Sequence, residues 1–280
     1  MSSTIDADRR ALLAALAGLT ASWGTIRPAG AEDIEAVTAP AQPRTTVLIT
    51  GSNRGLGLEF ARQYAARDWR IIATCRRPES ADQLNELASG NPDMFVEALD
   101  VTDHEAVDRL AARYRQVPID VLVNNAGIGG GMENQLFGRL QYEVFSTVMA
   151  VNAVGPIKMA EAFIEHVKAS GLKKIMTVSS SQGSIAQVNM PMLYWYRSSK
   201  SAVNMLMANL ALQLKRRGVT VGLVTPGATA TDFIAEEFRK RIPNIRQPDQ
   251  ATADMIRNID RFTLETTGQF FNYDGSVLPW

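Results

Sequence analysis

One pair of residues has the types and the spacing that acid–base chemistry on a helix requires. Residues 194–200 read YWYRSSK, so Tyr196 and Lys200 are four positions apart and would lie one above the other on a helical face. A free phenol has a pKa of about 10, too high for ready proton exchange near neutral pH. An ammonium about 4 Å away contributes roughly 4 kcal/mol at an effective dielectric of about 20, and burial opposes it. We therefore expect the pKa of Tyr196 to fall by about 2.

Such a phenol could give its proton to an oxygen that becomes negative in a transition state, as a carbonyl oxygen does when a hydride adds to its carbon. The neighbouring Tyr194 lacks the cation, because Ser198 stands four residues after it. We expect Tyr194 in a pocket wall or in the core.

A glycine-rich turn could bind the cofactor that supplies the hydride. Residues 45–50, TTVLIT, run directly into TGSNRGLGLEF at 50–60. Glycines let the backbone approach a diphosphate, and free N–H groups at a helix start face its charge. The strand, turn and helix in succession favour this interpretation over a turn that only reverses the chain. We predict that a dinucleotide is bound by Gly51, Asn53, Arg54, Gly55, Leu56 and Gly57.

The end of the second predicted strand indicates which dinucleotide binds. An NAD site usually has an acidic residue there, whereas this chain reads IIATCRRPE, with no carboxylate before Glu79. Guanidinium binds phosphate through paired hydrogen bonds, so Arg76 suits a 2′-phosphate, and Arg54 adds positive charge. We expect NADP(H) rather than NAD(H). Solvated surface arginines are the alternative, above all for Arg77.

The composition limits the other function classes. The chain has 280 residues, 46% of them hydrophobic and 21% charged, with zero formal net charge and a pI near 6.8. It can bury a substantial core, and nothing indicates a nucleic-acid or anionic-membrane surface. A single cysteine excludes an intramolecular disulfide. His104 and His166 lie far apart without a second ligand type nearby, so we expect no metal site.

Strand-like and helix-like stretches alternate from Thr45 onward. We predict strands at 45–50, 69–74, 94–99, 119–125, 173–180, 219–225 and 268–273, and helices at 56–67, 104–115, 142–169 and 198–217. Short, nearly continuous apolar strands separated by helices indicate a parallel sheet covered on both faces. We expect a single α/β domain at 45–280, a doubly wound Rossmann fold with seven parallel strands.

The first 44 residues have a different character. Arg9 and Arg10 precede a short apolar run at 11–23, and a small-residue segment ends at Ala31. This layout is typical of a twin-arginine export signal, cleaved after Ala31, which would make the protein periplasmic or exported. The alternative is an amphipathic or disordered extension on a cytoplasmic protein. We read 1–31 as the signal peptide and 32–44 as a linker.

Residues 45–280 resemble the short-chain dehydrogenase/reductase family. The resemblance rests on the glycine spacing, the Tyr196–Lys200 pair and a set of segments in the family's order: LDVTD (99–103), NNAG (124–127), VNAVGP (151–156), VSSSQG (178–183) and TPGATATD (225–232). YWYRSSKSAVN and the ending FFNYDGSVLPW are similar to the carbonyl reductases of the Sniffer and C-factor type.

This resemblance implies roles for individual residues. The catalytic four would be Asn152, Ser180, Tyr196 and Lys200, the last two also contacting the cofactor. The other cofactor contacts would be Asp100, Val101, Asn125, Ala126, Gly127, Pro226, Gly227 and Thr231. The stretch from Ser180 to Tyr196 is longer than the family usually shows, so Ser181 is the alternative catalytic serine.

The function expected from these features is NADP(H)-dependent interconversion of a carbonyl and an alcohol on a small, apolar substrate. The alternative is a cofactor-binding regulatory or signalling protein of the C-factor type with little turnover. A sugar-nucleotide epimerase or dehydratase usually has another glycine spacing and a longer C-terminal region. By resemblance, the long helices at 142–169 and 198–217 would form a homodimer or homotetramer.

Overall fold

The computed structural model describes residues 37, 44–234, 236–240 and 242–280. The predicted signal peptide at 1–31 lies outside the described residues, as does the predicted linker at 32–44 apart from Val37 and Arg44. All the described residues belong to one compact unit. Val37 donates its backbone N–H to Arg113 O at 3.0 Å and packs against the core, so this position of the predicted linker contacts the domain.

Seven parallel strands form one sheet, as predicted. The strands are β1 (Thr46–Thr50), β2 (Arg70–Cys75), β3 (Met94–Ala98), β4 (Val121–Asn124), β5 (Lys174–Val178), β6 (Thr220–Val224) and β7 (Phe270–Phe271). Their order is β3-β2-β1-β4-β5-β6-β7, and every pair is parallel. The order reverses between β1 and β4. Such a switch point leaves a crevice at the carboxyl ends of the strands, where α/β proteins bind ligands.

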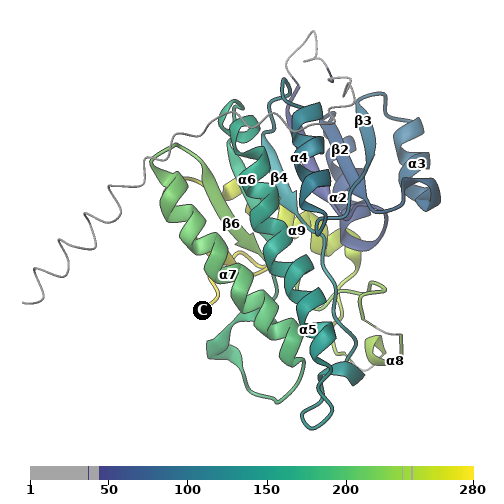
Figure 1. Ribbon diagram of the computed structural model, residues 1–280, viewed down its shortest axis with the longest axis vertical. Coiled ribbons are helices and arrows are strands. Elements are labelled where there is room, and N and C mark those ends of the chain that lie inside the picture. The colour runs from purple at the N-terminus through teal and green to yellow at the C-terminus, as the bar shows by residue number, and fades with distance from the viewer. Residues whose placement is uncertain (1–36, 38–43, 235, 241) are drawn as a thin grey trace, which may run out of the picture. The chain divides into compact units, whose positions relative to one another are not determined.

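Helices cover both faces of this sheet (Figure 1). They are α2 (Gly55–Ala65), α3 (Asp82–Ser89), α4 (His104–Arg113), α5 (Tyr142–Met149), α6 (Gly155–Lys168), α7 (Tyr194–Lys215), α8 (Glu236–Arg239) and α9 (Pro248–Arg261). One buried cluster joins α4, α6 and α7 to side chains such as Leu48 and Leu122. A second cluster joins α2 and α9 to the alternate residues, such as Val47 and Val121. Strands buried on both faces explain the continuous apolar runs in the sequence.

Two helices differ from the prediction in ways that matter for the site. The helix α7 begins at Tyr194, four residues before the predicted start, so Tyr196 and Lys200 both lie inside it. The predicted helix 142–169 is interrupted by a π-helical turn, Ala150–Val154, in which Gly155 N donates to Ala150 O. π-turns inside α-helices are frequent at functional sites.

The helical stretch Tyr142–Lys168 is long and apolar enough, by composition alone, to cross a membrane. In the fold it packs against α4, α7, β4 and β5, and 44% of its most apolar window is buried. That is the environment of a helix that covers a sheet.

Candidate active site

The loop after β1 has the shape of a phosphate cradle. Gly51 and Gly55 have φ values of +69° and +55°, which favour glycine. A Cβ on Gly57 would overlap Gly51 O and lie 2.6 Å from the Asn125 side-chain amide. The helix α2 begins behind this loop without a side-chain cap and without an acidic residue in its first turn. An uncapped helix start approached by bare backbone fits a bound diphosphate.

Hydrogen bonds tie the loop after β4 to this cradle. Thr50 Oγ1 accepts from the N–H groups of Asn125 and Ala126, both at 3.0 Å. The Asn125 side chain donates to Thr50 O at 2.9 Å and to Gly51 O at 3.1 Å. The segment Asn125–Gly127, to which the resemblance assigned cofactor contacts, therefore lies at the switch point between β1 and β4.

The π-turn places Asn152 against the next residue of that loop. Its side-chain oxygen accepts from Ile128 N at 2.9 Å, and its Nδ2 donates to Ile128 O at 2.8 Å and to Ser199 Oγ at 3.0 Å. A Cβ on Gly127 would lie 3.4 Å from Asn152 Oδ1 and 3.8 Å from Lys200 Nζ. Asn152, Gly127 and Lys200 thus meet at one point.

Ser180, Tyr196 and Lys200 converge at the carboxyl end of β5. Lys200 Nζ donates to Val178 O, the last residue of that strand, at 2.8 Å, and lies 5.9 Å from the centre of the Tyr196 ring. Ser180, rather than the alternative Ser181, lies against the phenol, and its hydrogen bond lowers the pKa of Tyr196. Ser179 is occupied elsewhere, because its hydroxyl donates to Asn204 Oδ1 at 2.6 Å.

The expected fall of the phenol pKa is wrong for this structure. Burial raises the pKa of Tyr196 to about 12, more than the Ser180 hydrogen bond lowers it. Burial also lowers the pKa of Lys200 from 10.5 to about 8. The lysine is not a fixed charge, because desolvation disfavours the charged form of both Tyr196 and Lys200. At neutral pH the phenol holds its proton, which is the form that an acid needs.

The remaining predicted cofactor residues line the same edge of the sheet. Arg76 follows β2 and is exposed, and it forms no ion pair with another described residue. Arg54 is exposed as well but pairs with Asp232 at 3.6 Å, a contact that water weakens. After β3, Asp100 accepts two hydrogen bonds from Thr102, at 2.9 Å from N and 2.7 Å from Oγ1. Its neighbour Val101 is buried, facing Gly155.

The segment after β6 reaches back over the cradle. Pro226 and Gly227, the latter with a φ of +72°, redirect the chain. Thr231 Cγ2 comes to 3.5 Å from the position a Cβ would take on Gly55. Phe233 lies with its ring 5.4 Å from the Tyr196 ring, centre to centre. Thus Thr231 lies beside the predicted diphosphate loop and Phe233 beside the predicted acid. Asn53 and Leu56 complete the loop, exposed and half-buried respectively.

Comparison with known proteins decides the family. A family model described as "short chain dehydrogenase" matches residues 45–242. The chain belongs to the short-chain dehydrogenase family.

The relatives of this chain include a dehydrogenase and a protein named C-signal. The chain is 34% identical over 239 residues to 1-hydroxy-2-glutathionyl-2-methyl-3-butene dehydrogenase of Rhodococcus sp. (strain AD45), over 84% of this chain and all of that protein. It is 31% identical over 163 residues to the C-signal of Myxococcus xanthus, over 58% of this chain and 93% of that protein.

Two solved structures share the fold of this dehydrogenase at 27% sequence identity. NADPH-bound carbonyl reductase from chicken fatty liver gives a TM-score of 0.76, and carbonyl reductase Sniffer of D. melanogaster gives 0.77. Each comparison covers 85% of this chain and the whole of the other. The expected resemblance to the Sniffer and C-factor type is confirmed, and the protein is an oxidoreductase similar to carbonyl reductases.

Hydrogen bonds hold the long loop between β5 and α7 near both of its ends. Arg197 donates from Nε to Gln182 Oε1 at 2.6 Å and from its guanidinium to Met190 O. Ser184 Oγ donates to Pro279 O at 2.6 Å, and Ala186 N donates to Trp280 O at 2.8 Å. A cavity of about 490 Å³ opens beside this loop, with walls formed by Val188–Met192, Tyr194, Arg197 and Ser198. Tyr194 is thus a pocket wall, one of the two roles expected for it.

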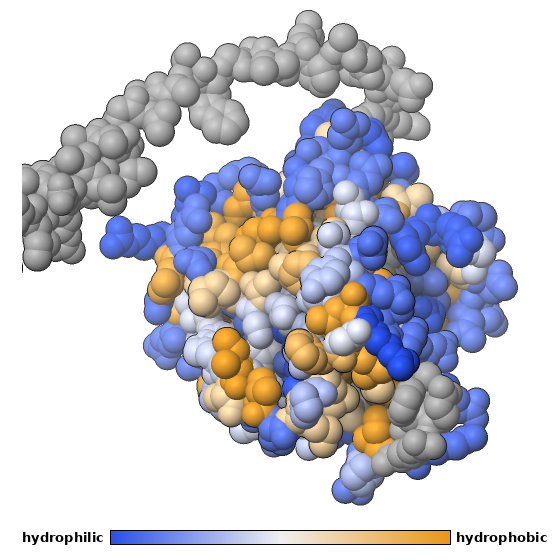
Figure 2. All heavy atoms as spheres, turned by 60° about the horizontal axis from the view of Figure 1, so that its bottom comes forward, coloured by the Kyte–Doolittle hydropathy of each residue, from blue (hydrophilic) through white to orange (hydrophobic). Residues whose placement is uncertain are grey.

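Apolar side chains are exposed around this region of the surface. Figure 2 looks at the molecule from the end that carries the start of α5 and the loop before α7, and orange apolar residues gather on it among polar ones. Among the exposed apolar side chains of the loops near the site are Phe137, Ile185, Val188, Met190 and Phe233, each at least 45% exposed. Contiguous exposed apolar surface often marks a ligand-binding groove.

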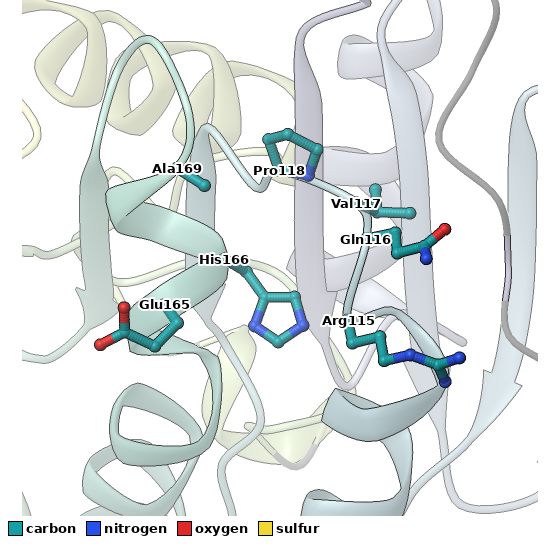
Figure 3. A pocket seen from close by; sticks show the side chains of 7 residues that line it. All are labelled: Arg115, Gln116, Val117, Pro118, Glu165, His166 and Ala169. Atoms are coloured by element: carbon teal, nitrogen blue, oxygen red, sulfur yellow. The ribbon is translucent and has the colours of Figure 1, made fainter.

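A separate hollow lies at the opposite edge of the sheet. Figure 3 shows the His166 ring pointing toward the loop Arg115–Pro118, with Glu165 and Ala169 beside it. The hollow holds about 210 Å³ and lies where β4 and β5 begin, away from the catalytic residues. His166 Nε2 lies 3.0 Å from Ala111 O, and burial lowers the pKa of its imidazole.

Two residues of the site were missed by the sequence analysis. Gln135 accepts a hydrogen bond from Tyr196 N, and Ser199 donates to Tyr196 O at 2.7 Å. Ser199 carried a signal, because it lies within the Tyr–Lys segment three positions after the tyrosine. Gln135 carried a weaker one, the three consecutive glycines at 129–131 that precede it.

Proposed function

We propose that this protein is an NADP(H)-dependent carbonyl reductase for small, apolar ketones or aldehydes. The observation that supports it most is the convergence of a protonated, buried phenol (Tyr196), a hydroxyl (Ser180) and an ammonium (Lys200) beside the cradle formed by Gly51–Gly57. This arrangement suits protonation of an oxygen next to a bound dinucleotide.

The cradle and Asn125–Gly127 would hold the cofactor, and a bound reduced nicotinamide supplies the hydride that adds to the carbonyl carbon. Ser180 donates a hydrogen bond to the carbonyl oxygen. Tyr196 transfers its phenolic proton to the same oxygen as negative charge develops there, giving the alcohol. Lys200 stabilises the phenolate that remains, and Val178 O holds the lysine in place. Reprotonation of the phenol completes the cycle.

NADP(H) is supported by the basic end of β2. Arg76 is exposed and not paired with any carboxylate of the described residues, and the chicken carbonyl reductase with the same fold was solved with NADPH bound. We expect Arg76→Ala to raise the KM for NADPH about 10-fold to 100-fold, because a charge-assisted pair with phosphate is lost, and to leave the KM for NADH within about 3-fold. Initial rates with each cofactor measure this. Equal weakening of both cofactors would exclude a 2′-phosphate contact.

An apolar substrate is supported by what surrounds Tyr196. The Phe233 ring lies 5.4 Å from the Tyr196 ring, centre to centre, and this apolar side chain is 45% exposed. Purified protein with NADPH should oxidise the cofactor, followed at 340 nm, when given apolar ketones, aldehydes or quinones. A broad panel without turnover would remove the reductase proposal.

The proton donor is tested by matched tyrosine variants. Tyr196→Phe should lower kcat by about 10² to 10⁴, the usual contribution of general acid catalysis. Tyr114→Phe is the control, because Tyr114 is also buried and hydrogen-bonded, to Glu97 at 2.6 Å, but lies at the far end of α4. A Tyr196→Phe variant that turns over like Tyr114→Phe would sink the mechanism.

A regulatory role is the second candidate, supported by the similarity to the C-signal of Myxococcus xanthus. The same Tyr196→Phe variant separates the two. A biological activity that survives the loss of turnover would favour the regulatory role.

A further inference from the structure

The helix that carries the catalytic pair begins without a local cap. Its N-cap residue, Leu193, has left-handed dihedrals (φ 55°, ψ 45°) and no side-chain hydrogen bond to the helix. The first backbone bond runs from Arg197 N to Leu193 O at 2.8 Å. The N–H groups before it have no partner within a helix, and a Ser, Thr, Asp or Asn at the cap normally accepts from the second or third of them. Leucine cannot do so.

Gln135 takes over this role from a distant part of the chain. Its Oε1 accepts from Tyr196 N at 2.8 Å across 61 positions of sequence. Tyr196 is the third residue of α7, so its N–H is one that a cap residue ordinarily binds. The Gln135 side chain belongs to a residue only 1% exposed, so water does not compete for this bond.

The other half of the amide fixes its orientation. Gln135 Nε2 donates to Gly129 O at 2.7 Å and to Gly131 O at 2.8 Å. The amide therefore uses both donors and directs its oxygen at Tyr196. A flipped amide would set its NH₂ against an N–H and its oxygen against two carbonyls, which costs all three bonds.

The loop whose carbonyl groups accept hydrogen bonds from Gln135 Nε2 is shaped around this amide. Gly130 and Gly131 have φ values of +77° and +71°. A Cβ on Gly130 would lie 2.8 Å from Val148 Cγ2 and 3.3 Å from Gln135 Nε2. This loop directly continues Asn125–Ile128, which would shape the cofactor pocket, so Gln135 joins that pocket to the backbone of the proton donor.

We propose that Gln135 is a positioning residue that caps the catalytic helix from the cofactor loop and so fixes Tyr196 relative to the bound nicotinamide. This inference rests on the proposed reductase function. Ser199 and Asn152 form a second link between the same loop and Tyr196 O, and the two links together hold both backbone polar groups of Tyr196.

The test compares Gln135→Leu with Asp120→Leu. Asp120 is a matched control because it is buried and also binds three backbone groups, Thr46 N, Gly171 N and Leu172 N at 2.9 to 3.1 Å, but at the opposite edge of the sheet. We expect Gln135→Leu to lower kcat about 10-fold to 100-fold, as a small displacement of a catalytic group does, with the carbonyl KM and NADPH Kd within about 3-fold. Asp120→Leu should lower thermal stability and leave kcat within about 3-fold. Equal kcat in the two variants would overturn the proposal.

Gln135→Glu provides a second variant that keeps the oxygen for Tyr196 N. When protonated, the introduced carboxyl can still donate to one glycine carbonyl; when ionised, its charge faces both. The variant should therefore approach wild-type kcat at low pH and lose activity as pH rises, with an inflection that the wild type lacks. A wild-type pH profile in Gln135→Glu would contradict the positioning role.

A separate reading does not depend on turnover. The phenol of Tyr196 can be titrated by ultraviolet difference spectroscopy, with Tyr196→Phe as the subtracted reference. In Gln135→Leu its pKa should fall from about 12 toward the ordinary value of about 10, because a loosened first turn admits water. If the wild-type protein reduced no carbonyl, the proposed reductase function would be wrong, but this titration would still test the role of Gln135. An unchanged phenol pKa would then refute the inference.

Discussion

Two buried lysines stand at the two ends of the same strand and have opposite surroundings. Lys174 is the first residue of β5 and 8% exposed, and its Nζ donates to Ile259 O at 2.7 Å and Asp260 O at 2.9 Å. Lys200 is 5% exposed and donates to Val178 O, at the last residue of β5. Both amines are held by backbone carbonyls, and burial lowers the pKa of both.

The difference lies in what compensates the charge. The carbonyls that bind Lys174 belong to the end of α9, where the helix dipole is negative, and the Asp260 carboxylate raises the pKa of the amine again. For Lys200 burial is the one cause of the shift, and it brings the pKa to about 8. Lys174, whose charge is partly compensated, has a structural role. Lys200, whose charge is not compensated, titrates near physiological pH. Such a perturbed group in a pocket is typical of a catalytic site.

The largest expected contrast is in turnover. Lys200→Met should lower kcat for carbonyl reduction at least about 100-fold, because the phenolate left by proton transfer loses its neighbouring charge. Lys174→Met, at the other edge of the sheet, should stay within about 3-fold. Steady-state rates with NADPH measure both. Similar losses in the two variants would mean that Lys200 acts only through the fold.

Stability should change in the opposite sense. The fall of the Lys200 pKa from 10.5 to about 8 means that burying its ammonium costs roughly 3 kcal/mol of folding free energy at neutral pH. The hydrogen bond to Val178 O offsets about 1 kcal/mol of this cost. Lys200→Met should thus stabilise the protein by about 2 kcal/mol. Lys174→Met should give a smaller change, because the Asp260 carboxylate offsets part of the burial and two carbonyls lose their donor. Denaturant unfolding at pH 7 measures both. A destabilised Lys200→Met variant would contradict the lowered pKa.

The smallest effect is in pH dependence. Because the folded pKa of Lys200 lies below its unfolded value, wild-type stability should rise with pH between about 8 and 10.5. The ammonium is lost over the same range, so kcat for reduction should decline severalfold above about pH 8. Lys174→Met should keep this inflection, and the stability of Lys200→Met should rise less than that of the wild type over this range. If the kcat profile of the wild type showed no inflection near pH 8, the charge of Lys200 would not limit the reaction.

The fold was readable from sequence because its signals are local. Each strand is a short apolar run, and the loops that follow β1, β2, β3, β4, β5 and β6 hold the predicted site residues. The carboxyl ends of parallel strands meet at one edge, so residues far apart in sequence could be placed together without coordinates. The predicted helix 198–217 began too late because Tyr194–Arg197 lacks a cap residue that would have marked the start.

The site chemistry was readable only in part. The direction of the Tyr196 pKa depends on how deeply two side chains are buried, which spacing does not reveal. Ser180 could be separated from Ser181 only once the Ser180 hydroxyl was seen to hydrogen-bond the Tyr196 phenol. Gln135 acts across 61 residues through a loop of irregular backbone, and no periodicity predicts such a contact.

The π-turn at Ala150–Val154 sets the rotational phase of α6, the helix that continues from it. One additional residue in a helical turn rotates the next helix by about 100° about its axis. Met159 and Phe163 face the sheet from α6 while Asn152 faces Ile128 and Ser199, and both orientations depend on that offset. A deletion of one residue here would turn the sheet-facing stripe of α6 aside, so insertions and deletions should be tolerated less in these five positions than in the helix on either side.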